Sequence, residues 1–427
     1  MKTGSRIGLT DLQEIWLRPF IEFETNLQME FLDLTEEENL YIPEADFDES
    51  TALTLHSIHK DKISVEFPTP LNNKCYVLRS KGYVGQIPVT GDLLLRIHPK
   101  VSIENLFRML EYAYNLESFD FLEGHISVES IDDLFERLVA ILAKSVLNRA
   151  RKGLYRGYVG DEESLPYLRG RILVMPSLRS AMRGSTRLEC EYEEHTADLD
   201  DNRILAWTLY RLPKFRLQRD EVRRQVRQAY RVLARAVEVT AVEARDCVRR
   251  LYHRLNEDYR PMHGLCRLFL EHCGPGVEVG EHDFIPFVLN MPSLFESFVA
   301  EWLRANPPSG ISVTQQYKAD LDERGIFFFR IDLLLKEATS DRVIAVMDTK
   351  YKREEHPKAG DIEQIVAYAA RMKTQNAFLI YPSTVTRSIT LPVGDVSVTS
   401  LHFNIAMDPD EAGKLFLEKL VNTLAFQ

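Results

Sequence analysis

Cysteine is scarce in this sequence, and its positions fit no metal-binding or disulfide pattern. The 427 residues include five cysteines, at positions 75, 190, 247, 266 and 273. No two of them stand in a CxxC spacing and the count is odd, which argues against a zinc ribbon and against a disulfide framework. We therefore expect these thiols to lie in the core or to be neutral surface groups.

Long apolar runs and a nucleotide-binding loop are missing as well. No window reaches the roughly 18 apolar residues that a membrane-spanning helix needs, and residues 1–16 contain no apolar signal segment. The motif GxxxxGK(S/T) occurs nowhere in the chain, so no P-loop is expected. With 45% hydrophobic and 27% charged residues, the composition predicts a soluble, cytoplasmic protein of two or three domains.

Charge is unevenly distributed along the chain, whose net charge is −11. Residues 1–60 hold 13 acidic and 4 basic side chains, whereas residues 203–260 hold 7 acidic and 15 basic ones. An acidic segment repels a phosphate backbone, so we expect its partner to be a protein. The basic middle could face DNA.

The order of periodic segments predicts a multidomain α+β protein. Apolar or alternating runs over residues 28–34, 52–58, 62–67, 75–78, 83–88 and 93–98 are typical of strands, and the last two suit a hairpin. After Pro99 the apolar spacing becomes helical. We predict an acidic, β-rich, partner-docking domain over 1–125, a mostly helical, basic region over 126–284, and an α/β domain with a mixed sheet over 285–427.

Two predicted strands in the last domain carry charged residues at adjacent ends. Residues 326–335 and 343–347 are rich in apolar residues and are separated by the polar loop KEATSDR, which predicts a hairpin. Asp332 lies within the first strand, and Asp348 and Lys350 end the second. Buried carboxylates are costly unless their charge is compensated, commonly by a divalent cation. A solvated ion pair of Asp348 with Lys350 is the alternative interpretation.

The spacing of these residues is the D…(D/E)xK arrangement of metal-dependent phosphodiesterases. Residues two apart in a strand point to one face, so Asp348 and Lys350 project together and the hairpin brings Asp332 beside them. Two carboxylates, the carbonyl of Thr349 and water would suit Mg²⁺ (or Mn²⁺). Lys350 would then orient or help to deprotonate the attacking water and offset charge in the transition state.

Two predicted helices flank the strands. In the first, from about residue 292, Ser293 and Glu296 fit a capping box, but Glu296 could instead be a third metal ligand; the sequence leaves both open. In the second, over residues 361–374, Gln364 and Tyr368 are four apart and share a face. They form either an ordinary helix edge or a polar pair that touches phosphate.

The basic middle region offers candidate DNA contacts. A helix over residues 219–238 has an apolar stripe and an arginine-rich remainder, where Arg224, Arg227 and Arg231 are candidates for backbone phosphate binding or for a solvated face. Residues 149–171 mix basic residues with glycine and tyrosine, as nucleic-acid loops and solvated connectors both do. The acidic turn at 198–202 is expected to cap a helix rather than to bind a metal.

Several stretches together resemble one known family. The motifs LFESFV, RIDLLL, MDTKYK, DIEQIVAYA and LIYP are similar to the PD-(D/E)xK nuclease module, and specifically to the McrC family, the nuclease subunit of McrBC-type modification-dependent restriction systems. The upstream stretches GYVGQIPVTGDLLLRIHPKVSIENLFRMLEYAYNL, LRGRILV and YEEHTADLDDNRILAWTL also resemble the patterns of this family. The resemblance therefore runs from about residue 80 to 382. One departure is that Ile331-Asp332 replaces the proline-aspartate of the nuclease signature.

This resemblance implies a function and a partner. It implies a Mg²⁺-dependent DNA endonuclease subunit that cleaves modified DNA when driven by an McrB-like hexameric AAA+ GTPase, whose GTP hydrolysis it stimulates. The N-terminal portion would dock into the central pore of that ring. Two alternatives remain open from the sequence: a GTPase-stimulating adaptor with little nuclease role, or a stand-alone DNA repair nuclease.

Overall fold

The chain folds into two compact units in the computed structural model. The described residues are 30–90, 93–116, 130–214, 217–248, 250–272, 277–279, 282–284, 287–322, 324–352, 357–382 and 388–425. One unit, the helical unit, is formed by residues 136–271; the other, the split unit, combines the described parts of 26–135 and 272–427. The protein is thus a mixed α+β protein with several sheets. The three-domain division stays a prediction.

The first part of the split unit is β-rich, as the sequence predicts. A three-stranded antiparallel sheet has the order β2 (Asn39–Pro43), β4 (Cys75–Ser80) and β3 (Ile63–Glu66). In a second sheet β1 (Glu30–Thr35) pairs in parallel with β6 (Leu93–His98), and β6 pairs antiparallel with β5 (Tyr83–Pro88). The predicted antiparallel pairing of residues 83–88 with 93–98 is therefore confirmed, whereas its tip at 91–92 lies outside the described residues.

One predicted strand in this part is wrong. Residues 52–58 belong to helix α2 (Glu49–Ile58). The Asp48 carboxylate accepts a hydrogen bond from the Thr51 amide at 3.2 Å, and so caps the first turn. Ala52 and Leu55, three apart, are fully buried, which is a helical and not an alternating spacing.

The fourth strand of the second sheet comes from far along the chain. Strand β12 (Phe287–Asn290) pairs antiparallel with β5 and leads directly into helix α9 (Met291–Ala305). Gly85 of β5 makes this approach possible: it has φ 135°, and a Cβ there would lie 2.1 Å from the Phe287 carbonyl oxygen. Helix α3 (Ile103–Tyr114) packs against α9 and donates a hydrogen bond from Asn105 to the Ile405 carbonyl at 2.9 Å.

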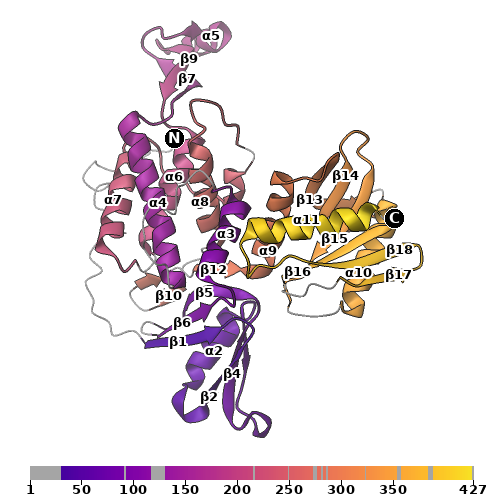
Figure 1. Ribbon diagram of the computed structural model, residues 1–427. Helices are drawn as coiled ribbons and strands as arrows, with labels where there is room; N and C mark the ends of the chain where they lie inside the picture. Colours follow the sequence, from indigo (N-terminus) through magenta and orange to yellow (C-terminus); the bar gives the residue numbers. More distant parts are fainter. Residues whose placement is uncertain are drawn as a thin grey trace. The chain divides into compact units, whose positions relative to one another are not determined.

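The remainder of the split unit is built on a six-stranded mixed sheet (Figure 1). Its order is β13 (Ile311–Asp320), β14 (Phe328–Glu337), β15 (Val343–Thr349), β16 (Asn376–Tyr381), β18 (Val396–His402) and β17 (Thr390–Val393). The predicted hairpin of β14 with β15 is antiparallel, and β15 and β16 are parallel across helix α10 (Ala359–Met372), as predicted. Ile365 and Ala369 of α10 are buried against this sheet. Helix α11 (Pro409–Ala425) completes the chain.

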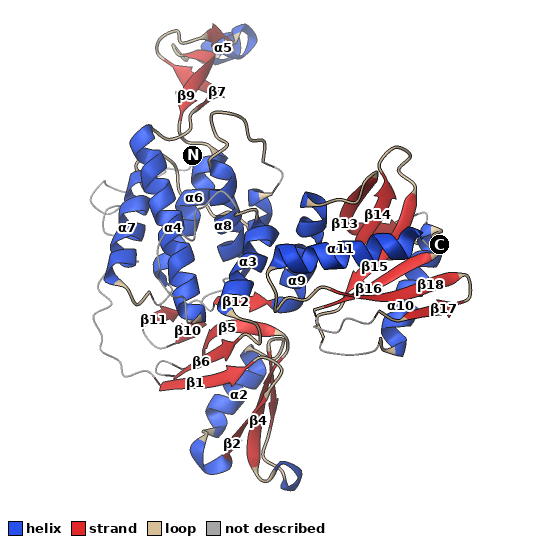
Figure 2. Ribbon diagram, viewed as in Figure 1, coloured by secondary structure: helices blue, strands red, loops and turns tan. Residues whose placement is uncertain are grey.

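In the residues that the structure describes, the helical unit shows long helices and a small β-rich arm (Figure 2). The helices are α4 (Ile131–Lys152), α6 (Asp200–Arg211), α7 (Asp220–Ala234) and α8 (Tyr259–His272). The predicted apolar stripe of α7 is confirmed, since Val222, Val226, Tyr230 and Leu233 are buried. The arm consists of β7 (Gly157–Leu165), β8 (Arg171–Ile172), α5 (Val174–Met182) and β9 (Leu188–Thr196). No helix within the described ranges is long and apolar enough to cross a membrane.

Candidate active site

The pairing of the middle of β14 with the end of β15 brings the predicted charged residues together. Leu333 pairs with Met347 in the antiparallel ladder. Asp332 and Asp348 are the next residues along the two strands in the same direction. The Asp332 Oδ2 accepts hydrogen bonds from the Thr349 amide at 2.9 Å and from its hydroxyl at 3.0 Å. Ile331 and Leu334 lie in the same buried cluster, so the alternation of β14 is broken around Asp332. Asp332 is thereby held within β14, bonded to Thr349 at the end of β15.

Lys350 joins the second strand end to helix α10. Its Nζ lies 2.7 Å from Asp348 Oδ2, an ion pair without the alignment of a hydrogen bond, and it donates to Gln364 Oε1 at 3.0 Å. Gln364 in turn donates to the Tyr368 hydroxyl at 2.6 Å. The structure therefore places Gln364 and Tyr368 in one chain of contacts with Lys350.

Asp361, which the sequence analysis did not single out, belongs to the same cluster. It is buried in the first turn of α10 and lies 3.7 Å from Lys350 Nζ and 3.3 Å from Lys352 Nζ. The sequence could have indicated Asp361, because it stands three residues before Gln364 and residues three apart on a helix share a face. Asp361 helps to fix the direction of the lysine side chain.

Glu296 does not serve as a helix cap. Helix α9 begins at Met291, and the side chain of Asn290 accepts the Ser293 amide at 3.1 Å, so Asn290 is the N-cap. The capping-box interpretation of Ser293 with Glu296 is therefore wrong. Glu296 instead accepts a hydrogen bond from Gln316, which the ladder of β13 places across from Asp332. Gln316 has φ 52° and was not singled out in the sequence, because positive φ at glutamine has no sequence signal.

The three carboxyl groups share an environment that opposes ionisation. Burial raises the pKa of Glu296 to about 7, and the Asp332 and Asp348 charges add to that rise. Burial and then Asp332 raise the pKa of Asp348 to about 6, and burial raises the pKa of Asp332 above its usual value. Burial alone would lower the pKa of Lys350, but Asp348 and Asp361 together raise it. The site thus carries more negative than positive charge, and the Lys350 ammonium group offsets only part of it.

The donor atoms at this site suit a divalent cation. Asp348 is only 2% exposed and its Oδ2 is paired with the Lys350 ammonium at 2.7 Å, so the charges of the neighbouring carboxyl groups remain to be compensated. Carboxylate oxygens are the ligands that Mg²⁺ prefers. Within the described ranges, however, no three His, Cys, Asp or Glu side chains already converge as a metal shell. Glu296, Asp332 and Asp348 fit such a cation by their chemistry, and binding would have to draw them closer together.

Stability of the metal-free protein should depend on pH through these carboxyl groups. An acid whose pKa is raised by folding destabilises the folded state as pH rises from its unfolded value to its folded value. The window runs from about 4 to the Glu296 pKa of about 7. We expect Mg²⁺ to raise the melting temperature more at pH 8 than at pH 5.5, because protons compete for the same oxygens.

Thermal unfolding of a matched pair of variants tests this expectation. Glu296→Gln should raise the melting temperature of the metal-free protein at pH 8 by about 3 °C and should weaken the Mg²⁺ response. Glu301→Gln, further along α9 and paired with Arg304, is the control and should leave that response unchanged. An equal Mg²⁺ response in the two variants would contradict a role for Glu296 at the cation.

A second contact reaches the strand end from the N-terminal part of the split unit. Glu36, which follows β1 and is 1% exposed, accepts a hydrogen bond from the Tyr351 hydroxyl at 3.3 Å. Lys100 Nζ lies 3.9 Å from the centre of the Tyr351 ring and 2.7 Å from a Glu37 oxygen. Burial raises the pKa of Glu36 to about 7. Tyr351 follows Lys350 directly, so the N-terminal part supports the chain at the candidate site.

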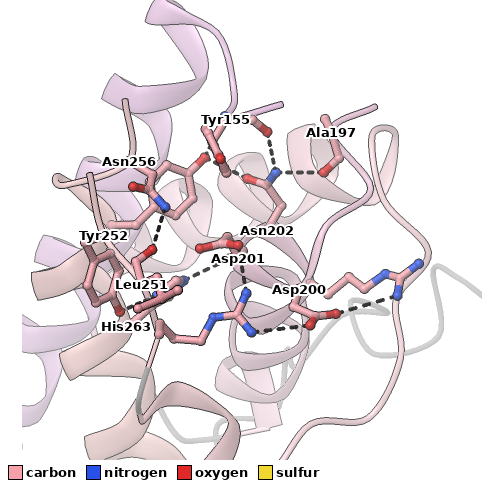
Figure 3. Close-up of polar contacts among 12 residues, drawn as sticks. Tyr155, Ala197, Asp200, Asp201, Asn202, Leu251, Tyr252, Asn256 and His263 are labelled. Atoms are coloured by element: carbon pink, nitrogen blue, oxygen red, sulfur yellow. Dashed lines mark hydrogen bonds and ion pairs between the residues drawn. The ribbon is translucent and has the colours of Figure 1, made fainter. Parts of the chain in front are cut away.

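The acidic turn of the helical unit is a structural network (Figure 3). The expected side-chain cap is wrong, since the N-cap of α6 is Leu199 and no side chain caps it. Arg250 pairs with Asp200 at 3.3 Å and with Asp201 at 2.7 Å. The Asn202 amide group donates to the Tyr155 carbonyl at 2.9 Å and to the Ala197 carbonyl at 2.7 Å. These two carbonyls flank β7 and β9, so Asn202 fastens both roots of the arm.

The predicted DNA-contacting arginines lie in the helical unit, on α7. Arg224 and Arg231 are exposed, and Arg227 is half-buried. Their neighbour Arg223 is engaged in an ion pair with Asp220. An exposed arginine row is compatible with phosphate contact and with a solvated face, so the DNA-binding role of these three residues stays a prediction.

Comparison with known proteins identifies the family. Residues 78–382 match the model of the McrBC 5-methylcytosine restriction system component. The chain belongs to this family. The resemblance that the sequence motifs indicate, from about residue 80 to 382, is thereby confirmed.

Two individual relatives agree with this assignment. The Escherichia coli (strain K12) protein named type IV methyl-directed restriction enzyme EcoKMcrBC is 23% identical over 310 residues, which cover 66% of this chain and 86% of that protein. McrC from Thermococcus gammatolerans, in a refined half-complex with McrB AAA+ hexamers, is 19% identical with a TM-score of 0.55 and covers 92% of this chain and 100% of that one. The structural likeness shows a shared fold.

Proposed function

We propose that this chain is the Mg²⁺-dependent DNA endonuclease subunit of an McrBC-like type IV restriction system and acts in the cytoplasm on modified DNA. The observation that carries the proposal is the contact chain from Asp348 through Lys350 and Gln364 to Tyr368, with Asp332 bonded to Thr349 beside it and the charges of Asp332 and Asp348 acting on Glu296. Family membership and the restriction-enzyme relative support it. A chain that only binds a partner would not need buried carboxylates and a lysine together at this part of the sheet.

The residues of this chain would divide the work of hydrolysis. A bound Mg²⁺ would polarise the phosphate and lower the pKa of a water molecule. Glu296, Asp332, Asp348 and the Thr349 carbonyl would hold the cation. Lys350, directed by Gln364 and Asp361, would orient the attacking water and offset the charge that develops on phosphate oxygens.

Nucleotide hydrolysis would come from a separate chain. The sequence has no P-loop motif, and the structural relative is bound to McrB AAA+ hexamers. We propose an McrB-like hexameric AAA+ GTPase as the partner, and that this chain stimulates its GTP hydrolysis. Purification of the chain from its native host should bring down such a GTPase.

Cleavage of modified duplex DNA by the purified complex tests the proposal. We expect cleavage with GTP, Mg²⁺ and both proteins, and none when Mg²⁺ is chelated. Strong cleavage by this chain alone would favour a stand-alone repair nuclease. Stimulation of GTP hydrolysis in a complex that never cuts modified DNA would favour an adaptor.

DNA binding by the isolated chain should be weak, indifferent to sequence and steeply dependent on salt, because the arginine-rich helix offers phosphate contacts and the sequence shows no recognisable base-reading motif. Replacing Arg224, Arg227 and Arg231 together by glutamine should weaken binding about equally on all duplex sequences. Fluorescence anisotropy at several salt concentrations measures this. A sharp preference of the isolated chain for one sequence would contradict the prediction.

A further inference from the structure

One face of the β13–β14 hairpin leads away from the candidate site and carries basic and aromatic side chains. In the ladder Lys318 stands opposite Arg330, and Asp320 stands opposite Phe328. Directly opposite residues share a face of a sheet, and all four of these are exposed. Gln316, also exposed and two residues before Lys318 in the chain, bonds to Glu296. The row therefore lies next in sequence to a residue that contacts a carboxylate of the candidate site.

Arg330 differs from the other charged residues of this row. Lys318 is engaged: its Nζ lies 2.9 Å from Asp320 and 4.6 Å from the centre of the Phe328 ring. In the part of the chain that the structure describes, Arg330 forms no ion pair. Arg330 stands two residues before Asp332 in β14 and opposite Lys318 of β13, so its backbone position adjoins the candidate site.

This placement is what a phosphate-binding arginine requires. A guanidinium matches two phosphate oxygens with paired hydrogen bonds, and one that forms no ion pair among the described residues breaks no such pair when it binds. Phe327 and Phe328, 67% and 43% exposed, follow toward the hairpin end. Exposed aromatic rings beside a cation suit the sugars and bases of a nucleic acid.

We propose that Arg330 binds a backbone phosphate of duplex DNA next to the bond that is cut, with Phe327 and Phe328 against the same strand. The β13–β14 hairpin is then a substrate-binding element of the nuclease site, separate from the arginines of α7. This inference rests on the proposed nuclease function. Arg330 is a binding residue here, and it takes no part in holding the cation.

Steady-state cleavage by the full complex tests the role of Arg330. Arg330→Gln should raise the KM for modified DNA about tenfold and lower the salt slope of binding by about one, with kcat within about twofold of the original. Arg330→Lys keeps the charge and should recover part of the KM. Arg342→Gln is the matched control: it lies beyond the opposite end of β14, is exposed and contacts Glu337, and should behave like the parent protein.

Binding measured without catalysis keeps the test independent of activity. Anisotropy of a labelled duplex in Ca²⁺ should show the same order, with Arg330→Gln weakest, and melting temperatures should be equal in all variants. A parental KM and salt slope in Arg330→Gln would overturn the inference. A loss of kcat at unchanged KM would also overturn it, because Arg330 would then act on Glu296 and not on the DNA. Cleavage by Asp348→Ala at the parental rate would instead overturn the proposed nuclease site.

Discussion

Asp348→Ala should reduce Mg²⁺-dependent cleavage of modified DNA by about a thousandfold or more and leave the partner's GTP hydrolysis stimulated as before. Asp348 is 2% exposed, and its pKa is raised first by burial and then by Asp332, so its removal relieves charge repulsion in the metal-free protein. The variant should therefore fold. Asp332→Ala should lose cleavage in the same way.

Paired assays separate chemistry from folding and docking. GTP turnover and cleavage are measured in the same reactions with the partner present, and melting temperature without Mg²⁺ reports folding. Lys350→Ala should lose cleavage but keep the Mg²⁺-induced rise in melting temperature. Asp341→Ala, an exposed carboxylate in the β14–β15 loop, is the control and should cut normally. Parental cleavage by Asp348→Ala would show that the site has been assigned wrongly.

Much of this site could be predicted because its signals are local. Asp332, Asp348 and Lys350 fall on two strands joined by a short hairpin, and a period of two fixes which side chains project together. Gln364 and Tyr368 follow from the helical period. The structure confirms the strands and the helix, and it links Asp348, Lys350, Gln364 and Tyr368 by contacts while Asp332 bonds to Thr349; their catalytic and metal-binding roles remain predictions.

Other parts of the site depend on contacts between distant segments. Glu296 fitted a capping box by spacing alone, and only the position of Asn290 at the start of α9 shows that the helix begins three residues earlier. Gln316 meets Glu296 across an irregular point in β13, which no residue pattern marks. Glu36 meets Tyr351 over a separation of 315 residues. Local periodicity cannot report such pairings.

In the fold as well, features set by neighbouring residues could be predicted, and pairings between distant segments could not. Residues 52–58 alternate well enough to suggest a strand, yet the Asp48 cap and a buried face make them a helix. Strand β12, from the predicted third domain, pairs with β5 from the predicted first domain, a pairing between distant segments that no local pattern marks. Removing residues 1–120 would take β1, β5, β6 and α3 from the split unit, so such a truncation cannot locate the docking surface.

The arm of the helical unit is a second candidate for docking on the GTPase. Its segment 167–182 carries large exposed apolar side chains: Tyr167 59%, Leu168 61%, Val174 58%, Met175 60%, Leu178 53% and Met182 89%. Concentrated exposed apolar surface marks interaction sites. Its own small core is elsewhere, at Leu165, Cys190 and Tyr192. Among its described residues, the N-terminal part, which the charge distribution favours as the docking surface, exposes fewer such side chains.

Replacing Tyr167, Met175 and Leu178 together by serine should therefore abolish most of the stimulation of GTP hydrolysis, because an interface that loses several central apolar contacts weakens by about a hundredfold or more. Cleavage of modified DNA should fall with it, although the nuclease residues are untouched. Tyr41→Ser with Leu71→Ser, two exposed positions in the N-terminal part, is the matched control. If the control lost stimulation and the arm variant kept it, docking would lie in the N-terminal part, as the charge distribution predicts.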